Sequence, residues 1–115
     1  MIELTVLNYL QTALTTSDGS VPVYAEMPVE MPTTFVVVGK TGSGRNNRID
    51  NATIAIKSYA PTLYEASSLN ETVKAHMDEM ANNTTVFRCK LNSDYNYTDT
   101  SLKRYRYQAV YDIYY

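Results

Sequence analysis

The segment Gly39-Lys40-Thr41 has the residue types that end a phosphate-binding loop, and it follows an apolar run typical of a strand. A phosphate loop needs a further glycine five residues before the Gly-Lys pair, so that consecutive backbone amides can surround the phosphates. Thr34 occupies that position here, and Gly42 would interrupt the helix that should follow. The sequence therefore argues against nucleotide hydrolysis.

Two single residues could carry acid–base, metal or nucleophilic chemistry: His76 is the only histidine and Cys89 the only cysteine. A histidine needs an orienting carboxylate to act as a base, or further ligands to bind a metal, and none stands at suitable spacing. Cys89 lies in a predicted strand rather than at a helix N-terminus, which favours a buried thiol over an activated one. We therefore expect no enzyme activity, no catalytic residue, no metal and no cofactor.

A third candidate for chemistry is the glycine-rich polar segment from Lys40 to Arg48, whose lack of periodicity predicts a mobile loop. Its cationic residues Lys40, Arg45 and Arg48 could pair with DNA phosphates or with an acidic neighbour. Solvated loop charges are an equally good interpretation. The net charge of −2 and the pI near 5.3 give no overall positive field for binding a nucleic-acid backbone.

The composition bounds the class of protein. With 115 residues, 44% hydrophobic and 19% charged, the chain has the size and profile of one folded domain, so we assign residues 1–115 to a single domain. The start lacks an export signal, and no apolar run approaches the roughly 20 residues that span a bilayer. We expect a protein made in the cytoplasm, without contact to a membrane.

Two segments have the apolar spacing of amphipathic helices. Ile2 to Leu14 repeats apolar residues every three or four positions and should end in the short polar residues around Gly19. Pro61 suits the first turn of a second helix, which runs to about Met80 with apolar and charged residues on opposite sides. Each helix is therefore expected to pack one face on a sheet.

The remaining periodic segments predict strands, separated by proline pairs and polar links. These strands are Thr33 to Gly39, Asp50 to Tyr59, Thr84 to Leu91 and Arg104 to Tyr115, with a short extended segment at Val21 to Ala25 and a polar link at Asn92 to Lys103. The order helix, strands, helix, strands predicts an α+β fold, an antiparallel or mixed sheet with two α-helices packed on one face.

Tyrosine dominates the aromatic residues, with 11 Tyr beside 2 Phe and no Trp. A tyrosine-rich surface is often exposed to water in the free protein and covered by a partner in a complex. Several tyrosines can also shield a small sheet from solvent. The continuously apolar strand at Phe35 indicates that both of its faces are covered, by a helix and either a neighbouring subunit or a long loop. Both features favour an assembly protein.

The pattern also resembles a known family. Tyr24 and Met27-Pro28 precede the strand that begins Phe35-Val-Val-Val, and a Gly/Arg/Asn segment follows it. The strand Ile54-Ala-Ile-Lys-Ser-Tyr-Ala-Pro61 leads directly into the helix at Glu65-Ala66, and Arg106-Tyr-Gln-Ala-Val-Tyr111 lies near the end. From Val21 onward the chain is similar to the small head–tail joining and tail-completion proteins of long-tailed bacteriophages, including the tail terminators.

Members of that family form rings, often hexameric, at the junction between capsid connector and tail tube. The resemblance implies a structural virion protein whose partners are its own copies, the tail tube protein and a head connector or stopper protein. It implies subunit contacts at Phe35, Val37, Tyr105, Tyr107 and Tyr111. It also implies that Lys40, Arg45 and Arg48 face the lumen or a neighbouring ring, with transient contact to DNA in the lumen. Both positions, ending the tail tube and closing the head, stay open.

The alternative function is a small nucleic-acid-binding module. In it Tyr105, Tyr107 and Tyr111 would stack on bases while Lys103, Arg104 and Arg106 hold phosphates. Strand alternation argues against this grouping, because Arg104 and Arg106 point away from those tyrosines. A small enzyme ranks last, since no nucleophile–base pair, metal cluster or phosphate loop can be named.

Overall fold

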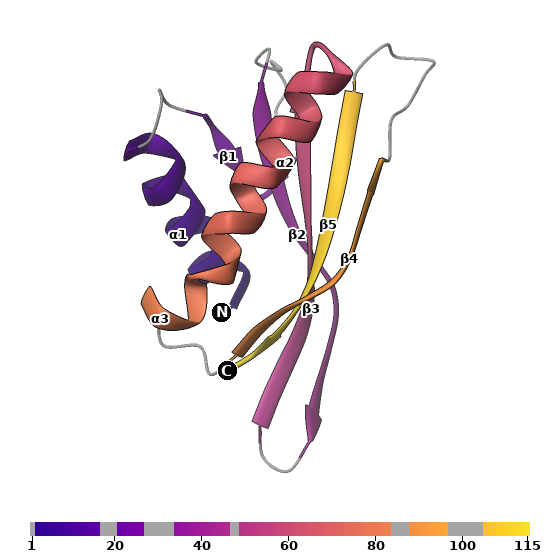
Figure 1. Ribbon diagram of the computed structural model, residues 1–115. Helices are drawn as coiled ribbons and strands as arrows, with labels where there is room; N and C mark the ends of the chain where they lie inside the picture. The colour runs from indigo at the N-terminus through magenta and orange to yellow at the C-terminus, as the bar shows by residue number, and fades with distance from the viewer. Residues whose placement is uncertain (1, 17–20, 27–33, 47–48, 84–87, 97–104) are drawn as a thin grey trace.

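The computed structural model describes residues 2–16, 21–26, 34–46, 49–83, 88–96 and 105–115. Within these ranges the chain forms one five-stranded sheet, in the order β1-β2-β3-β5-β4, with two long helices on one face (Figure 1). The elements are α1 (Ile2–Thr16), β1 (Val23–Tyr24), β2 (Phe35–Asn46), β3 (Ile49–Ala60), α2 (Leu63–Asp78), α3 (Met80–Asn83), β4 (Arg88–Asn96) and β5 (Tyr105–Tyr114).

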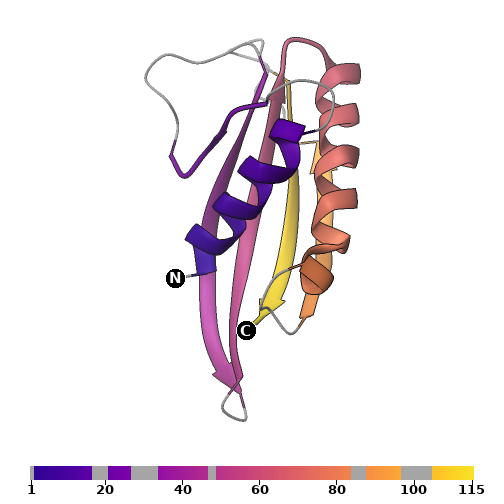
Figure 2. The same ribbon diagram turned by 90° about the vertical axis from the view of Figure 1, so that its left-hand side faces the viewer.

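The sheet is mixed, because β1 runs parallel to β2 while all other neighbouring strands are antiparallel. Figure 2 shows α1 and α2 side by side over the same side of the sheet. The predicted α+β class, with two helices on one face of a mixed sheet, is therefore confirmed. Among the described helices, none combines the length and the apolar character needed to cross a membrane.

The hydrophobic core lies between the helices and the sheet. The helices contribute apolar stripes and the central strands contribute every second residue, as the two periodicities require. The buried members of this core are Ile2, Val6, Leu10, Leu14, Val23, Val36, Val38, Ala52, Ile54, Ile56, Leu69, Val73, Met77, Met80, Ala109, Tyr111 and Ile113. The helix stripes predicted from the sequence are thus the faces that pack on the sheet.

A polar link joins α2 to the edge strand β4. The Nζ of Lys74 lies 2.9 Å from a carboxylate oxygen of Asp94 and 2.9 Å from one of Glu71. Both hydrogen bonds raise the pKa of the Lys74 ammonium group, and the one to Asp94 makes the larger contribution. The amide of the buried Asn70 also donates to Asp94, at 3.2 Å. The edge strand is therefore held in place by charge pairing as well as by its ladder with β5.

Helix α2 begins with a cap that the sequence prediction placed wrongly. Thr62 is the N-cap, in extended backbone conformation, and its Oγ1 accepts a hydrogen bond from the amide of Glu65 at 3.1 Å. Pro61 therefore lies before the helix rather than in its first turn. The side-chain oxygen of a threonine can accept a hydrogen bond from a free amide of the first turn, which proline cannot do. The helix therefore begins at Leu63, directly after this cap.

Replacing Thr62 with alanine is expected to lower the free energy of unfolding by about 1 kcal/mol, because one amide of the first turn loses its acceptor. Urea denaturation followed by circular dichroism will measure the change. Thr72→Ala is the matched control, since Thr72 is exposed in mid-helix and its hydroxyl only donates back to the carbonyl of Ser68. Equal losses for the two variants would contradict the capping role.

The predicted loop from Lys40 to Arg48 is wrong over most of its length. Strand β2 continues to Asn46 and pairs with β3 as far as the partners Asn46 and Ile49, with a bulge between Lys40 and Gly42. The Oγ1 of Thr41 donates to the carbonyl of Thr53 at 3.2 Å. This part of β2 has no alternating apolar residues, because no core lies beneath it to require them. Pairing with β3 sets its extended conformation and satisfies its backbone hydrogen bonds.

The fourth strand also differs from its predicted range. The prediction ended it at Leu91 and made Asn92 onward a polar link, whereas β4 continues to Asn96 after a bulge between Leu91 and Ser93. The predicted start, residues 84–87, lies outside the described residues. An edge strand buries few side chains, so its sequence can be polar throughout. A prediction based on apolar periodicity does not detect such a strand.

Candidate assembly surface

The second face of the sheet, opposite α1 and α2, carries the candidate functional surface. Side chains alternate along a strand, so Val36 and Val38 lie under the helices while Phe35 and Val37 lie on the other face. No helix in the described part of the chain covers that side. We call it the helix-free face, and its described side chains include Tyr24, Phe35, Val37, Asn51, Thr53, Ala55, Lys57, Tyr59, Arg88, Lys90, Asn92, Ser93, Tyr95, Arg106, Gln108, Val110, Asp112 and Tyr114.

One end of the helix-free face is an aromatic cluster. The rings of Phe35 and Tyr59 are stacked, with centroids 4.5 Å apart and an angle of 4° between their planes. Tyr24 meets Phe35 edge-on at 6.2 Å. The guanidinium of Arg106 lies 5.6 Å from the centroid of the Tyr59 ring and donates to the Tyr59 hydroxyl at 3.1 Å. Aromatic and cation–π contacts therefore make this end rigid.

The middle of the face is an open hollow of about 350 Å³. Its lining combines small or apolar residues with polar and cationic ones, namely Val37, Gly39, Lys40, Thr41, Ala55, Lys57 and Gln108. Gly39 and Ala55 are register partners, so the floor of the hollow carries almost no side-chain volume. Lys57 is half-buried there and makes no ion pair with a described carboxylate.

Hydrogen bonds between strands organise the rest of the face. Asp112 accepts from the Thr53 hydroxyl at 3.1 Å and from the Asn92 amide at 2.9 Å. Gln108 donates to the Tyr95 hydroxyl at 2.7 Å. These bonds run across β3, β5 and β4, so they fix the relative positions of exposed side chains on three strands.

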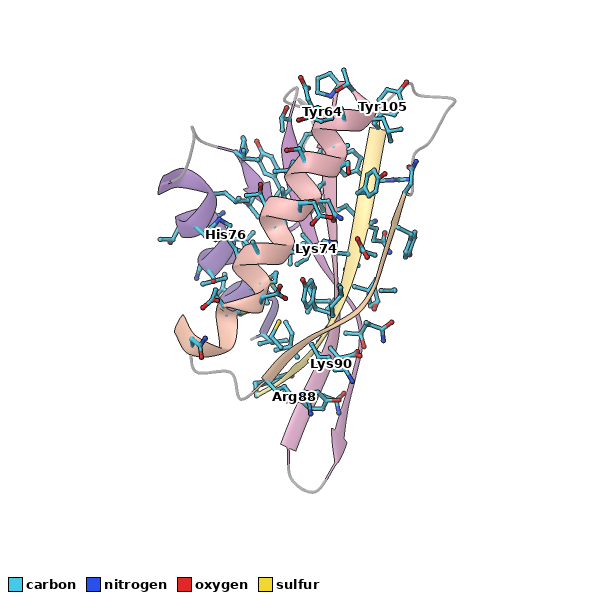
Figure 3. The ribbon with its side chains drawn as sticks, viewed as in Figure 1. Tyr64, Lys74, His76, Arg88, Lys90 and Tyr105 are labelled. Atoms are coloured by element: carbon cyan, nitrogen blue, oxygen red, sulfur yellow. The ribbon has the colours of Figure 1, made fainter. Side chains whose placement is uncertain are left out.

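The helix-free face is predominantly cationic. Arg88 and Lys90 are exposed and stand opposite Tyr114 and Asp112 in the β4–β5 ladder, and Figure 3 shows both along the same half of β4. The described side chains of this face carry four cationic groups, on Lys57, Arg88, Lys90 and Arg106, and one carboxylate, on Asp112. A chain with a net charge of −2 thus has a positive surface.

The five predicted contact residues do not form one surface. Phe35 and Val37 lie on the helix-free face, whereas Tyr105, Tyr107 and Tyr111 alternate onto the helix-covered face. Phe35 and Tyr111 are fully buried within the single chain, so neither side chain is available to a second subunit in this arrangement. The reason is that both complete a core inside the chain, Tyr111 beneath α2 and Phe35 between Tyr24 and Tyr59.

Tyr105 and Tyr107 remain half-exposed, and contact through them stays a prediction. Figure 3 places Tyr105 close to Tyr64, at the end of the molecule where α2 begins. Of the three residues assigned to the lumen, Lys40 is exposed on β2 and lines the hollow. Arg45 belongs to β2 by its backbone, and Arg48 lies outside the described residues.

The grouping proposed for nucleic-acid binding does not survive in its original form. Tyr111 is buried in the core and cannot stack on a base, and Arg106 holds the ring of Tyr59 on the opposite face of the sheet. Residues 103 and 104 lie outside the described ranges. The cations that do gather include Lys57, Arg88 and Lys90, which lie inside the predicted strands 50–59 and 84–91. They were missed because the sequence does not show that both strands pair with β5 and so bring these side chains onto one face.

Neither single residue acquires a chemical partner. The backbone carbonyl of His76 accepts the Tyr9 hydroxyl, which anchors α1 to α2. Burial raises the pKa of the Cys89 thiol to about 12, with a smaller contribution from the Asp78 carboxylate, so the thiol is neutral at physiological pH. Within the described ranges, no group of three or more His, Cys, Asp or Glu side chains is arranged to hold a metal ion.

The buried Cys89 thiol and Tyr111 phenol predict that the fold loses stability in alkali. Burial raises both pKa values, from 9.0 to about 12 for Cys89 and upward from 10.0 for Tyr111. Their stabilisation is therefore fully present below about pH 9 and is lost as the pH rises toward the folded-state pKa values. For each of the two groups, the free energy of unfolding should fall by up to about 1.4 kcal/mol for every unit by which the pH rises in this range.

Urea denaturation from neutral pH to about pH 11 will measure this slope. Cys89→Ala should make it shallower, because one of the two ionising groups is removed. An unchanged slope in that variant would show that the thiol does not contribute.

Comparison with known proteins assigns no family to this surface: no protein-family model and no curated protein matches the chain.

Proposed function

We propose that the chain is a structural virion protein of a long-tailed bacteriophage, whose copies form a hexameric ring at the head–tail junction. The ring ends or caps the tail tube and joins it to the capsid connector. Its partners are its own copies, the tail tube protein and a head connector or stopper protein, and the ring contacts DNA transiently in its lumen. No chemical step belongs to this function.

The observation that carries the proposal is the helix-free face. In a two-layer domain with both helices on one side, the other side of the sheet stays accessible to a partner. Here that side combines aromatic, small and cationic groups, which is the mixture found in polar protein–protein interfaces. The sequence resemblance supplies the biological setting, and the fold supports it by matching the expected element order.

Light scattering over a concentration series tests the proposal. A discrete ring, or a monomer that forms one only with a tail tube or connector protein, is the expected result. A strict monomer that ignores both partners would overturn it. Electron microscopy of the assembled fraction will count the subunits and separate six from any other stoichiometry.

A nucleic-acid-binding module is the second candidate, and the four cations on the helix-free face favour it. It ranks second because Asp112 lies among those cations and the aromatic rings at the end of the face are packed against one another. Filter binding at increasing salt will decide, since phosphate contacts give a steep loss of affinity with salt concentration.

A further inference from the structure

The two layers of the molecule carry opposite charge. The outer side of the helix layer exposes carboxylates on Glu65, Glu71, Asp78 and Glu79, and its one lysine, Lys74, is paired with Glu71 and Asp94. The helix-free face on the far side of the sheet is predominantly cationic. Surfaces of opposite sign on opposite sides of one molecule attract when copies meet head to tail, and repel when like faces meet.

The start of α2 is the most exposed apolar feature of the helix layer. Tyr64 is 82% exposed and Leu63 is 42% exposed, although both are large hydrophobic residues. Figure 3 shows Tyr64 at the end of the molecule, directed away from the body. Glu65 follows immediately, and its exposed carboxylate has no partner among the described side chains. The segment therefore presents an aromatic ring beside a free negative charge.

The hollow of the helix-free face has the complementary properties. Its floor of Gly39, Ala55 and Val37 is small and apolar, and about 350 Å³ is enough space for a tyrosine side chain. Lys57, whose side chain alternates onto this face, belongs to its lining together with Gln108. Within one chain the sheet separates α2 from the hollow, so the two features can meet only between copies.

We propose that Tyr64 and Glu65 of one copy dock in the hollow of the next, with the ring on the Gly39–Ala55 floor and the carboxylate facing Lys57. This contact rests on the proposed ring and names the two surfaces that build it. It joins different patches on the two copies, so it is heterologous, and it builds a ring when the rotation from one copy to the next closes. The Tyr64 ring buries apolar area, and the charge pair sets the orientation.

A second copy fits the hollow better than a nucleic acid does. A phosphate backbone would meet the Asp112 carboxylate on the same face, and the small floor offers no exposed aromatic ring for base stacking. The chain itself supplies both the acidic and the aromatic group that the hollow lacks. Charge complementarity between the two layers therefore favours self-association.

Charge reversal and rescue test the proposal. Glu65→Lys and Lys57→Glu should each weaken self-association of the full chain by at least about tenfold in sedimentation or light scattering. The double variant Glu65→Lys/Lys57→Glu should recover to within about threefold of the original affinity.

Tyr64→Ser should weaken association without changing any charge. Glu79→Lys is the matched comparison: it makes the same charge change at the other end of α2, outside the docking segment, and should weaken association clearly less than Glu65→Lys. Circular dichroism melts will show whether each variant folds.

The outcomes separate this contact from the proposed function. Rescue by the double variant supports the docking. A ring that stays intact in Glu65→Lys, Lys57→Glu and Tyr64→Ser overturns the docking and leaves the ring itself standing. A strict monomer in the original chain overturns both, and loss of DNA binding in Lys57→Glu would then assign the hollow to phosphates. If Lys57→Glu does not fold, Lys57→Gln takes its place, and unchanged association in that variant counts against the contact.

Discussion

Replacing Tyr111 with alanine is expected to lower the free energy of unfolding of the single chain by about 3–5 kcal/mol. Tyr111 is among the largest fully buried side chains and lies at the centre of the core between β5 and α2. Its removal would leave a cavity surrounded by residues on both layers, which the sheet cannot collapse to fill. Urea denaturation of the variant, at a concentration where the protein is monomeric, will measure the loss.

Tyr111→Phe is the matched control. The Tyr111 hydroxyl lies 3.5 Å from the carbonyl of Lys74, which is long for a hydrogen bond, so we expect a loss of about 1 kcal/mol or less. The pair of variants also decides between two roles for this residue. A Tyr111→Ala chain that keeps its stability and loses only its assembly would restore Tyr111 to a subunit interface.

Replacing Phe35 with alanine should be almost as costly, at about 3–4 kcal/mol, although Phe35 lies on the helix-free face. The ring is fully buried between Tyr59, on which it stacks, and Tyr24, which meets it edge-on. Thermal and urea denaturation of the variant will show the loss. Phe35→Leu keeps most of the buried volume and should lose clearly less.

A double-mutant cycle with Tyr59→Ala isolates the stacking itself. We expect a coupling energy of about 0.5–1.5 kcal/mol between Phe35 and Tyr59, beyond the area that each ring buries. A coupling energy of zero would mean that the two rings contribute only by volume. Normal stability in Phe35→Ala would mean that the aromatic cluster is not part of the folded core.

These two residues show how burial expected from the sequence came to be assigned to a subunit contact. An apolar or aromatic residue on a strand indicates burial, and in a small chain rich in tyrosine that burial was assigned to a neighbouring subunit. In the folded chain, Tyr24 and Tyr59 bury Phe35 and the helix α2 buries Tyr111. Whether such a residue is buried by a partner subunit or by its own chain depends on which segments, far apart in the sequence, pack together in the fold.

The hairpin of β2 and β3 shows a second limit. Residues 40–46 have the composition of a loop, and they form a strand because the partner β3 lies beside them and satisfies their backbone groups. Lys40 and Lys57 are 17 positions apart in the sequence, and they line one hollow only through that pairing. Local propensity carries no information on such a long-range register.

The sequence by itself determined the class of fold: the two amphipathic helices, the central strands and their helix-covered faces follow from apolar periods that any packing of these elements must bury. It also determined that no phosphate loop or disulfide exists, because those need particular residues at particular spacings. Only the tertiary structure decided which side of the sheet stays free of helices, which strands run on without an apolar pattern, and which cations gather. Those features depend on contacts between residues far apart in the chain, and solvent-facing positions impose no pattern that the sequence would have to show.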